Sequence, residues 1–146
     1  MALDVGEARI GLARGEVGSR FAFGRGALVR SGRQADDVAA VAASAAAEGA
    51  SLVVVGLPLR ARGGDSLQTQ RVRSFAQALR AAGLRVELLD ERFTTALAQR
   101  QIAGSALSRG RRQEKGRLDE GAAVAILETY LERQAAAAAG EEGATP

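Results

Sequence analysis

The sequence predicts an α/β domain with a five-stranded mixed sheet and helices on both faces. Three strand-like segments follow one another through short turns within the first 29 residues. Two later strand-like segments, 52–55 and 84–89, each follow a segment with helical spacing. A three-strand meander followed by such crossovers gives an antiparallel part and a parallel part in one sheet. With 146 residues, 47% of them apolar, the chain is long enough for one core.

The meander is expected over residues 2–6, 9–14 and 21–29. The first two strands are joined at Gly6-Glu7-Ala8, where a glycine suits a tight hairpin turn. In the third, Gly24 and Gly26 favour a bulge or extra twist.

Helices are expected on either side of the apolar run Leu52–Val55, which resembles a parallel strand covered on both faces. Residues 35–48 have apolar side chains at helical spacing, and Gly49 ends that helix. Ser66 can cap a second helix that Gly83 closes.

After the strand at 84–89, Thr94 or Thr95 is expected to cap a short helix that ends near Gly104. A mobile loop is expected over 105–117, and a final helix over 118–133. The domain is therefore predicted to span 1–134. The tail 135–146 is rich in alanine and glycine, has no core residue, and is expected to be disordered.

The composition restricts the kinds of site that the chain can form. It has no cysteine and no histidine, which excludes disulfides, thiolate metal sites and imidazole bases. A metal would be held by oxygen ligands, which favours Mg²⁺ or Mn²⁺. We find no apolar segment of membrane-spanning length and no leader, and expect a cytoplasmic protein without membrane association.

Three carboxylates lie at positions where structure alone does not require them. Asp4 lies inside the first strand, Glu91 follows the fifth, and Asp119 lies on the sheet-facing row of the last helix. Each has an ordinary explanation: backbone hydrogen bonds for Asp4, a solvated turn for Glu91, and the helix dipole for Asp119. We expect the three carboxylates to converge at one end of the sheet. Clustered like charges need a cation, and oxygen-only ligation suits two-metal phosphoryl transfer.

Cationic residues crowd the segment before Asp119. Residues 100–117 contain six cations and one acid, Glu114. Such a run is usually a solvated loop, but beside a carboxylate metal site it also suits a phosphodiester backbone. The residues expected to contact nucleic acid are Arg92, Arg100, Arg109, Arg111, Arg112, Lys115 and Arg117.

Five motifs in order resemble the YqgF family, also called RuvX and described as Holliday junction resolvases or pre-16S rRNA nucleases. They are LDVGEARIGLA at 3–13, VVVGLPL at 53–59, TQRVRSFAQAL at 69–79, DERFTT at 90–95 and LDEGAAVAILETYLE at 118–132. The resemblance covers nearly the whole chain except the tail.

This resemblance implies an RNase H-like, RuvC-related fold and metal-dependent hydrolysis of nucleic acid in the bacterial cytoplasm. It assigns Asp4, Glu91 and Asp119 as catalytic residues and metal ligands, with two Mg²⁺ or Mn²⁺ ions bound together with substrate. The chain departs from RuvC-type enzymes in two places. No acid ends the fourth strand, at Gly56-Leu57-Pro58, so Glu91 would substitute from the neighbouring strand. Ala122 stands where a second helix acid is typical.

Two other functions stay open at the level of sequence. The chain could be a non-catalytic nucleic-acid-binding factor in ribosome assembly or transcription. The Asp-x-Gly hairpin also occurs in ATPase and sugar-kinase lobes, but those proteins need two lobes. The expected substrate is structured RNA, branched DNA or both, and resolving a junction would require a homodimer.

Overall fold

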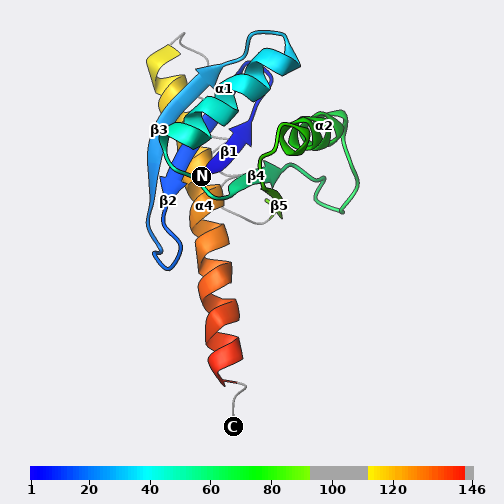
Figure 1. Ribbon diagram of the computed structural model, residues 1–146. Coiled ribbons are helices and arrows are strands. Elements are labelled where there is room, and N and C mark those ends of the chain that lie inside the picture. Colours follow the sequence, from blue (N-terminus) through cyan, green and yellow to red (C-terminus); the bar gives the residue numbers. More distant parts are fainter. Residues whose placement is uncertain (93–111, 144–146) are drawn as a thin grey trace.

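The computed structural model describes residues 1–92 and 112–143 of the chain, with side chains over 1–92 and 120–140 (Figure 1). The strands are β1 (Ala2–Val5), β2 (Arg9–Gly15), β3 (Ala22–Val29), β4 (Val53–Leu57) and β5 (Val86–Asp90). The helices are α1 (Gln34–Ala47), α2 (Leu67–Ala81) and α4 (Arg112–Gly143).

The five strands form one mixed sheet in the order β3-β2-β1-β4-β5. β2 pairs antiparallel with both β1 and β3, whereas β4 runs parallel to β1 and β5 runs parallel to β4. The predicted meander and parallel pair are therefore confirmed. Because β1 and β4 lie side by side although about 50 residues separate them, the ends of β1, β4 and β5 meet at one edge of the sheet.

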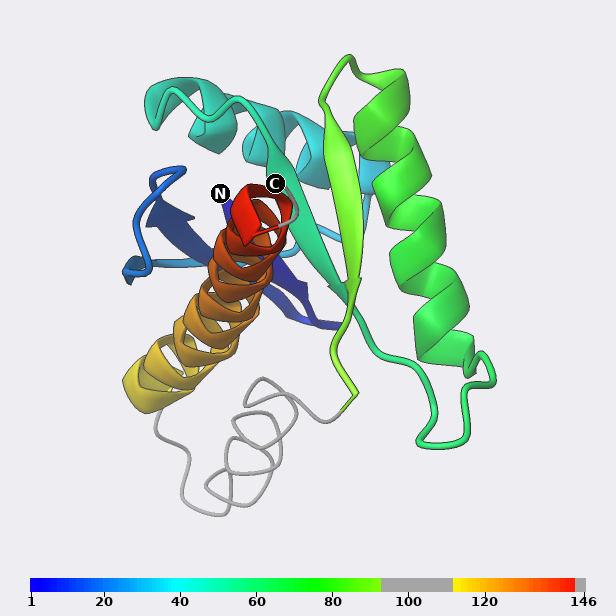
Figure 2. The same cartoon turned by 90° about the horizontal axis from the view of Figure 1, so that it is seen from below.

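The helices cover the two faces of the sheet, as predicted. α1 and α2 lie on one face and α4 lies on the other (Figure 2). The core under α1 and α2 is rich in large side chains, among them Leu3, Ile10 and Phe75. The core under α4 contains more alanine, including Ala2, Ala13 and Ala123. Small side chains let α4 lie close to the strands.

Ser66 begins α2, as the sequence predicted. The Ser66 Oγ accepts a hydrogen bond from the Thr69 backbone N at 3.1 Å, and the Thr69 Oγ1 accepts one from the Ser66 backbone N at 3.0 Å. This reciprocal cap satisfies two donors at the helix start. The buried Thr69 hydroxyl also donates to the Pro58 carbonyl at 2.5 Å. The chain that leaves β4 is thereby fixed to the first turn of α2.

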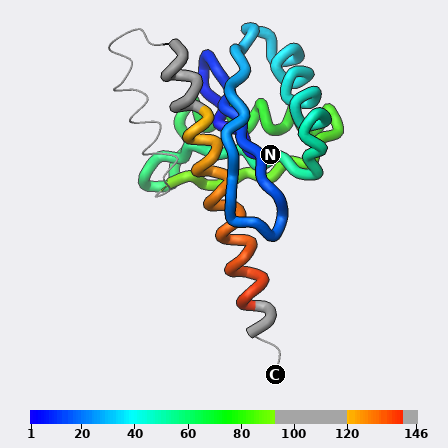
Figure 3. Tube along the Cα trace, turned by 90° about the vertical axis from the view of Figure 1, so that its left-hand side faces the viewer, coloured from blue at the N-terminus to red at the C-terminus, as the bar shows by residue number. Residues whose placement is uncertain are grey.

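α4 is longer than the sequence predicted. Residues 112–117, expected in a mobile loop, are helical, so that expectation is wrong for this stretch. At the other end the helix continues through the alanine run 135–139 to Gly143, and it projects past the sheet (Figures 1 and 3). Alanine is the best helix former, and a helix already begun propagates into such a run without core contacts. The short helix expected before Gly104 lies outside the described residues.

No helix in the described part of the chain is both long and apolar enough to cross a membrane.

A buried aspartate links the start of α1 to the turn after β1. The Asp37 carboxylate accepts hydrogen bonds from the Ser31 backbone N at 2.9 Å and from the Arg30 Nε at 3.1 Å. The Arg30 Nη1 donates to the Gly6 carbonyl at 3.0 Å, and its guanidinium lies 5.2 Å from the centre of the Phe75 ring. Burial opposes ionisation of Asp37, but the bonds from Ser31 and Arg30 outweigh it and keep the pKa of this carboxyl below its ordinary value.

We predict that Asp37→Asn lowers the free energy of unfolding by about 1–3 kcal/mol at neutral pH. Because the folded pKa of Asp37 is depressed, its contribution is present above the unfolded pKa and is lost as pH falls through the folded pKa. Urea unfolding at pH 7 and at pH 3 measures this. The exposed neighbour Asp36 supplies the control, and Asp36→Asn should have little effect. A difference between wild type and Asp37→Asn that is the same at both pH values would contradict the prediction.

Candidate active site

Asp4 lies in the middle of the sheet, on the face that α4 covers. Its neighbours Leu3 and Val5 pack into the core under α1 and α2, whereas Ala2 packs under α4. Because side chains alternate along a strand, Asp4 shares the face of Ala2. It lies opposite Gly11 of β2 and is 4% exposed. The sequence prediction of a carboxylate inside the first strand is thus matched by a buried aspartate.

Glu91 directly follows β5 and lies on the same face. Leu89 packs into the core under α4. Glu91 is two residues farther along the chain, so alternation of side chains along the strand direction puts it on the same face as Leu89. The Glu91 backbone N donates to the Leu57 carbonyl at 3.3 Å, which extends the β4–β5 pairing by one step. Its side chain is 2% exposed.

Gly56 of β4 brings these two carboxylates onto neighbouring positions. The pairing of Leu3 with Val55 sets Gly56 beside Asp4, one step farther along the two parallel strands. A Cβ atom on Gly56 would lie 2.5 Å from Oε2 of Glu91 and 2.5 Å from Cδ1 of Ile126. The Glu91 carboxylate therefore occupies the space that a side chain on β4 would need. Sequence reasoning noted that this strand end lacks an acid but missed that glycine makes room for Glu91.

The third predicted carboxylate, Asp119, belongs to α4, and its side chain lies outside the described residues. Its backbone is one helical turn before Ala123, which is fully buried against the sheet. The adjacent Glu120 is held by β3. Its Oε2 accepts a hydrogen bond from the Gly26 backbone N at 2.6 Å, and its carboxyl lies where a Cβ on Gly24 would be. Glu120 therefore fixes the start of the buried part of α4 to the edge of the sheet.

The neighbouring cation Arg92 forms an ion pair within its own turn. Its Nη2 lies 2.6 Å from Oδ2 of Asp90, and its hydrogen bonds, against the effect of burial, hold the pKa of the Asp90 carboxyl below its ordinary value. The other predicted contacts with nucleic acid lie outside the described side chains. They are Arg100, Arg109, Arg111, Arg112, Lys115 and Arg117. Of these, Arg112, Lys115 and Arg117 have backbones in α4.

The described side chains alone do not complete a metal site. Among them, no group of three acidic, histidine or cysteine side chains is arranged to hold a metal ion. Asp4 and Glu91 supply two carboxylates at one edge of the sheet, and a third ligand would have to come from another residue, for which Asp119 is the candidate.

We predict that Gly56→Ala destabilises the protein, because the added methyl group would overlap both the Glu91 carboxylate and Ile126. Overpacking of this kind costs about 1–3 kcal/mol in the free energy of unfolding. Gly64→Ala is the matched control, since its nearest neighbour would be 3.9 Å from the new Cβ. Chemical denaturation of both variants measures the difference. Equal stability of the two variants would show that the space above Gly56 is not needed.

Comparison with known proteins identifies the family of the chain. Residues 1–133 match the sequence profile of the family described as "RuvX: Holliday junction resolvase". A Thermus thermophilus protein named "Putative pre-16S rRNA nuclease" is 52% identical over 132 residues, which cover 90% of this chain and 96% of that protein. A Deinococcus radiodurans protein named "Ribonuclease YqgF" is 43% identical and covers 91% of this chain and 87% of its own length. With its RNase H-like mixed sheet, the chain belongs to the RuvX family.

Proposed function

We propose that this nuclease of the RuvX family hydrolyses phosphodiester bonds of nucleic acid at Asp4, Glu91 and Asp119, with the help of divalent metal ions. The observation that carries the proposal is the packing of the Glu91 carboxylate over Gly56, on the strand beside Asp4. Two buried carboxylates on one face of the sheet have the chemistry of a metal site, not that of an apolar core.

The residues present fit Mg²⁺ or Mn²⁺. The chain has no histidine or cysteine, so the donors are carboxylate oxygens, which hard divalent cations prefer. Two negative groups brought near each other also favour a bound cation. Two such ions, when bound, would activate the attacking water and stabilise the leaving 3′ oxygen, leaving a 5′-phosphate and a 3′-hydroxyl.

Each of the three carboxylates belongs to a different helix or strand end, and each is held in place by different contacts. Asp4 is held by pairing of β1 with a strand on either side. Glu91 is held at the end of β5 by its bond to Leu57. In this proposal Asp119 completes the set from α4, which Glu120 fastens to β3. Rigid supports of this kind keep ligands at a productive geometry.

The substrate that the comparisons favour is the precursor of 16S ribosomal RNA. The Thermus relative carries this substrate in its name and is similar over nearly its full length. Branched DNA is the second candidate, because the description of the family names the Holliday junction. Both are structured nucleic acids of the bacterial cytoplasm, where we expect the protein to act. Cutting a junction symmetrically would need two copies of the chain, whereas trimming an RNA end would not.

A non-catalytic nucleic-acid-binding factor is the alternative. It would use the same basic segment and would leave the carboxylates without a chemical role. The absence of an acid on β4 itself is what favours it. Cleavage that depends on Asp4 separates the two functions.

We predict that Asp4→Asn lowers the rate of Mn²⁺-dependent cleavage by about 10³-fold or more, since a metal contributes several kcal/mol to the transition state. Binding of substrate should be largely kept. The assay is a panel of precursor ribosomal RNA, single strands, duplex and four-way DNA junction, with Mg²⁺ or Mn²⁺. Asp36→Asn should cleave like wild type. Full activity of Asp4→Asn would exclude the metal mechanism, and cleavage of the junction alone would identify DNA as the substrate.

We predict that replacing Arg109, Arg111 and Arg112 with alanine weakens binding and flattens its dependence on salt. Each lost phosphate contact lowers the slope of log K against log salt by about 0.7–0.9, so three contacts lower it by about 2–3. Fluorescence anisotropy at several salt concentrations measures the slope. A triple alanine variant at Arg14, Arg20 and Arg85, at the opposite end of the sheet, is the control. Equal slopes for both triple variants would show that the basic segment is only a solvated surface.

A further inference from the structure

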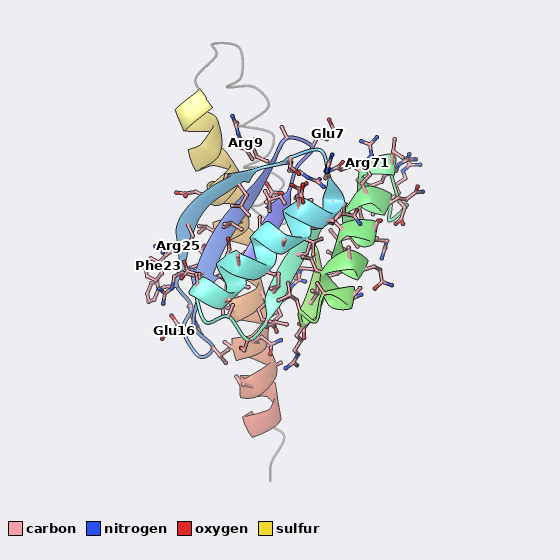
Figure 4. All side chains as sticks on the ribbon, turned by 45° about the horizontal axis from the view of Figure 1, so that its top comes forward. Glu7, Arg9, Glu16, Phe23, Arg25 and Arg71 are labelled. Atoms are coloured by element: carbon pink, nitrogen blue, oxygen red, sulfur yellow. The ribbon has the colours of Figure 1, made fainter. Side chains whose placement is uncertain are left out.

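Arg9 begins β2 at the edge of the sheet where the candidate carboxylates lie. The Gly6 backbone N donates to the Arg9 carbonyl at 2.8 Å and closes the turn between β1 and β2. Ile10 packs under α1 and α2, so Arg9 shares the opposite face with Gly11, the residue that pairs with Asp4. Figure 4 shows Arg9 at the same end of the molecule as Glu7 of the β1–β2 turn and Arg71 of α2, far from Phe23 and Arg25 at the other end. The cationic Arg9 therefore lies on the same face of the sheet, and at the same edge, as Asp4 and Glu91.

The Arg9 side chain differs from the other arginines of the described chain. Its Nη1 is buried and has no hydrogen-bond partner within 1–92 and 120–140. Six arginines in the same ranges form ion pairs with acids: Arg14, Arg25, Arg30, Arg71, Arg73 and Arg92. The others are exposed, so water can satisfy their donors.

A guanidinium carries five N–H donors and stays charged at every physiological pH. A buried donor that lacks a partner is costly, because it gives up its hydrogen bonds to water. A fold that keeps such a donor beside its candidate site is expected to satisfy it with something that binds there. Planar, bidentate anions are the ligands that suit an arginine best, and phosphate is the anion that a nucleic acid presents.

We propose that Arg9 binds a backbone phosphate of the nucleic acid and so positions the strand over Asp4 and Glu91. This rests on the proposed function of the same site and deepens it by assigning a cation outside the basic segment before Asp119. Sequence reasoning treated Arg9 only as part of the second strand. A purely structural role, as an internal counter-ion for the buried carboxylates, is the competing explanation.

The test measures binding without cleavage. Arg9→Gln and Arg9→Lys are made in the Asp4→Asn background, and a fluorescein-labelled RNA hairpin with a single-stranded extension is titrated at several salt concentrations. We expect Arg9→Gln to weaken binding about tenfold and to lower the salt slope by about 0.7–0.9, the value of one phosphate contact. Arg9→Lys should restore the slope but not the full affinity, because lysine lacks the bidentate fork. Arg14→Gln, a half-exposed arginine at the far end of the sheet, should change neither.

The melting temperature of the same Arg9 variants, with Asp4 intact, separates a binding role from a structural one. Loss of a guanidinium whose buried Nη1 has no partner within 1–92 and 120–140 should leave the melting temperature unchanged or raise it. An unchanged affinity and slope in Arg9→Gln would overturn the proposal, as would a lowered melting temperature with an unchanged slope. Neither result depends on cleavage, so failure of the nuclease mechanism would appear separately, as full activity of Asp4→Asn.

Discussion

The burial of two carboxylates under one helix is the constraint from which the rest of this structure follows. Asp4 and Glu91 are almost fully enclosed on the face that α4 covers. Charged groups lose the hydration of water when they are buried, so the surroundings must supply polar partners or a cation. Large apolar side chains around them would supply neither and would fill the space that an ion needs.

The two faces of the sheet differ for this reason. Under α1 and α2, large aliphatic side chains and Phe75 fill the core and provide most of the apolar burial. Under α4, Gly11 lies opposite Asp4, Gly56 makes room for the Glu91 carboxylate, and the core contains more alanine. One face thus stabilises the fold through large apolar side chains, while the other has smaller side chains and leaves space for a polar site. Gly56 shows this most directly, because even one methyl group there would displace the Glu91 carboxylate.

Polar contacts at the same edge of the sheet hold the backbone that carries the site. Arg30 binds the carbonyl of Gly6, two residues after Asp4, and Thr69 binds the carbonyl of Pro58, two residues after Gly56. Glu120 binds the backbone of Gly26 and anchors α4. These bonds connect the ends of β1 and β4 and the interior of β3 to three different helices or turns. Ligands on such supports keep their positions before any ion or substrate arrives, which lowers the cost of ordering them on binding.

Much of this fold was predictable from local patterns. Apolar runs and helical spacing predicted the five strands, α1 and α2, and Ser66 predicted the start of α2. The extent of α4 was not predictable from core spacing, because residues 135–139 are helical through alanine propensity alone. Asp4 stood out as an acid inside an apolar strand, and Glu91 as an acid directly after the fifth strand. The role of Gly56 could not be predicted from the sequence. Only the register of β1, β4 and β5 shows that the missing side chain at this position leaves space for the Glu91 carboxylate from the next strand.

The most direct test is a crystal structure of the full chain grown with saturating Mn²⁺ and a bound RNA product, with anomalous scattering used to locate the metal. We predict two anomalous peaks about 3.5–4 Å apart at the ends of β1 and β5. We also predict that Asp4, Glu91 and Asp119 are the protein ligands to these ions. Peaks elsewhere, or ions at this edge that Asp4 and Glu91 do not touch, would contradict this prediction.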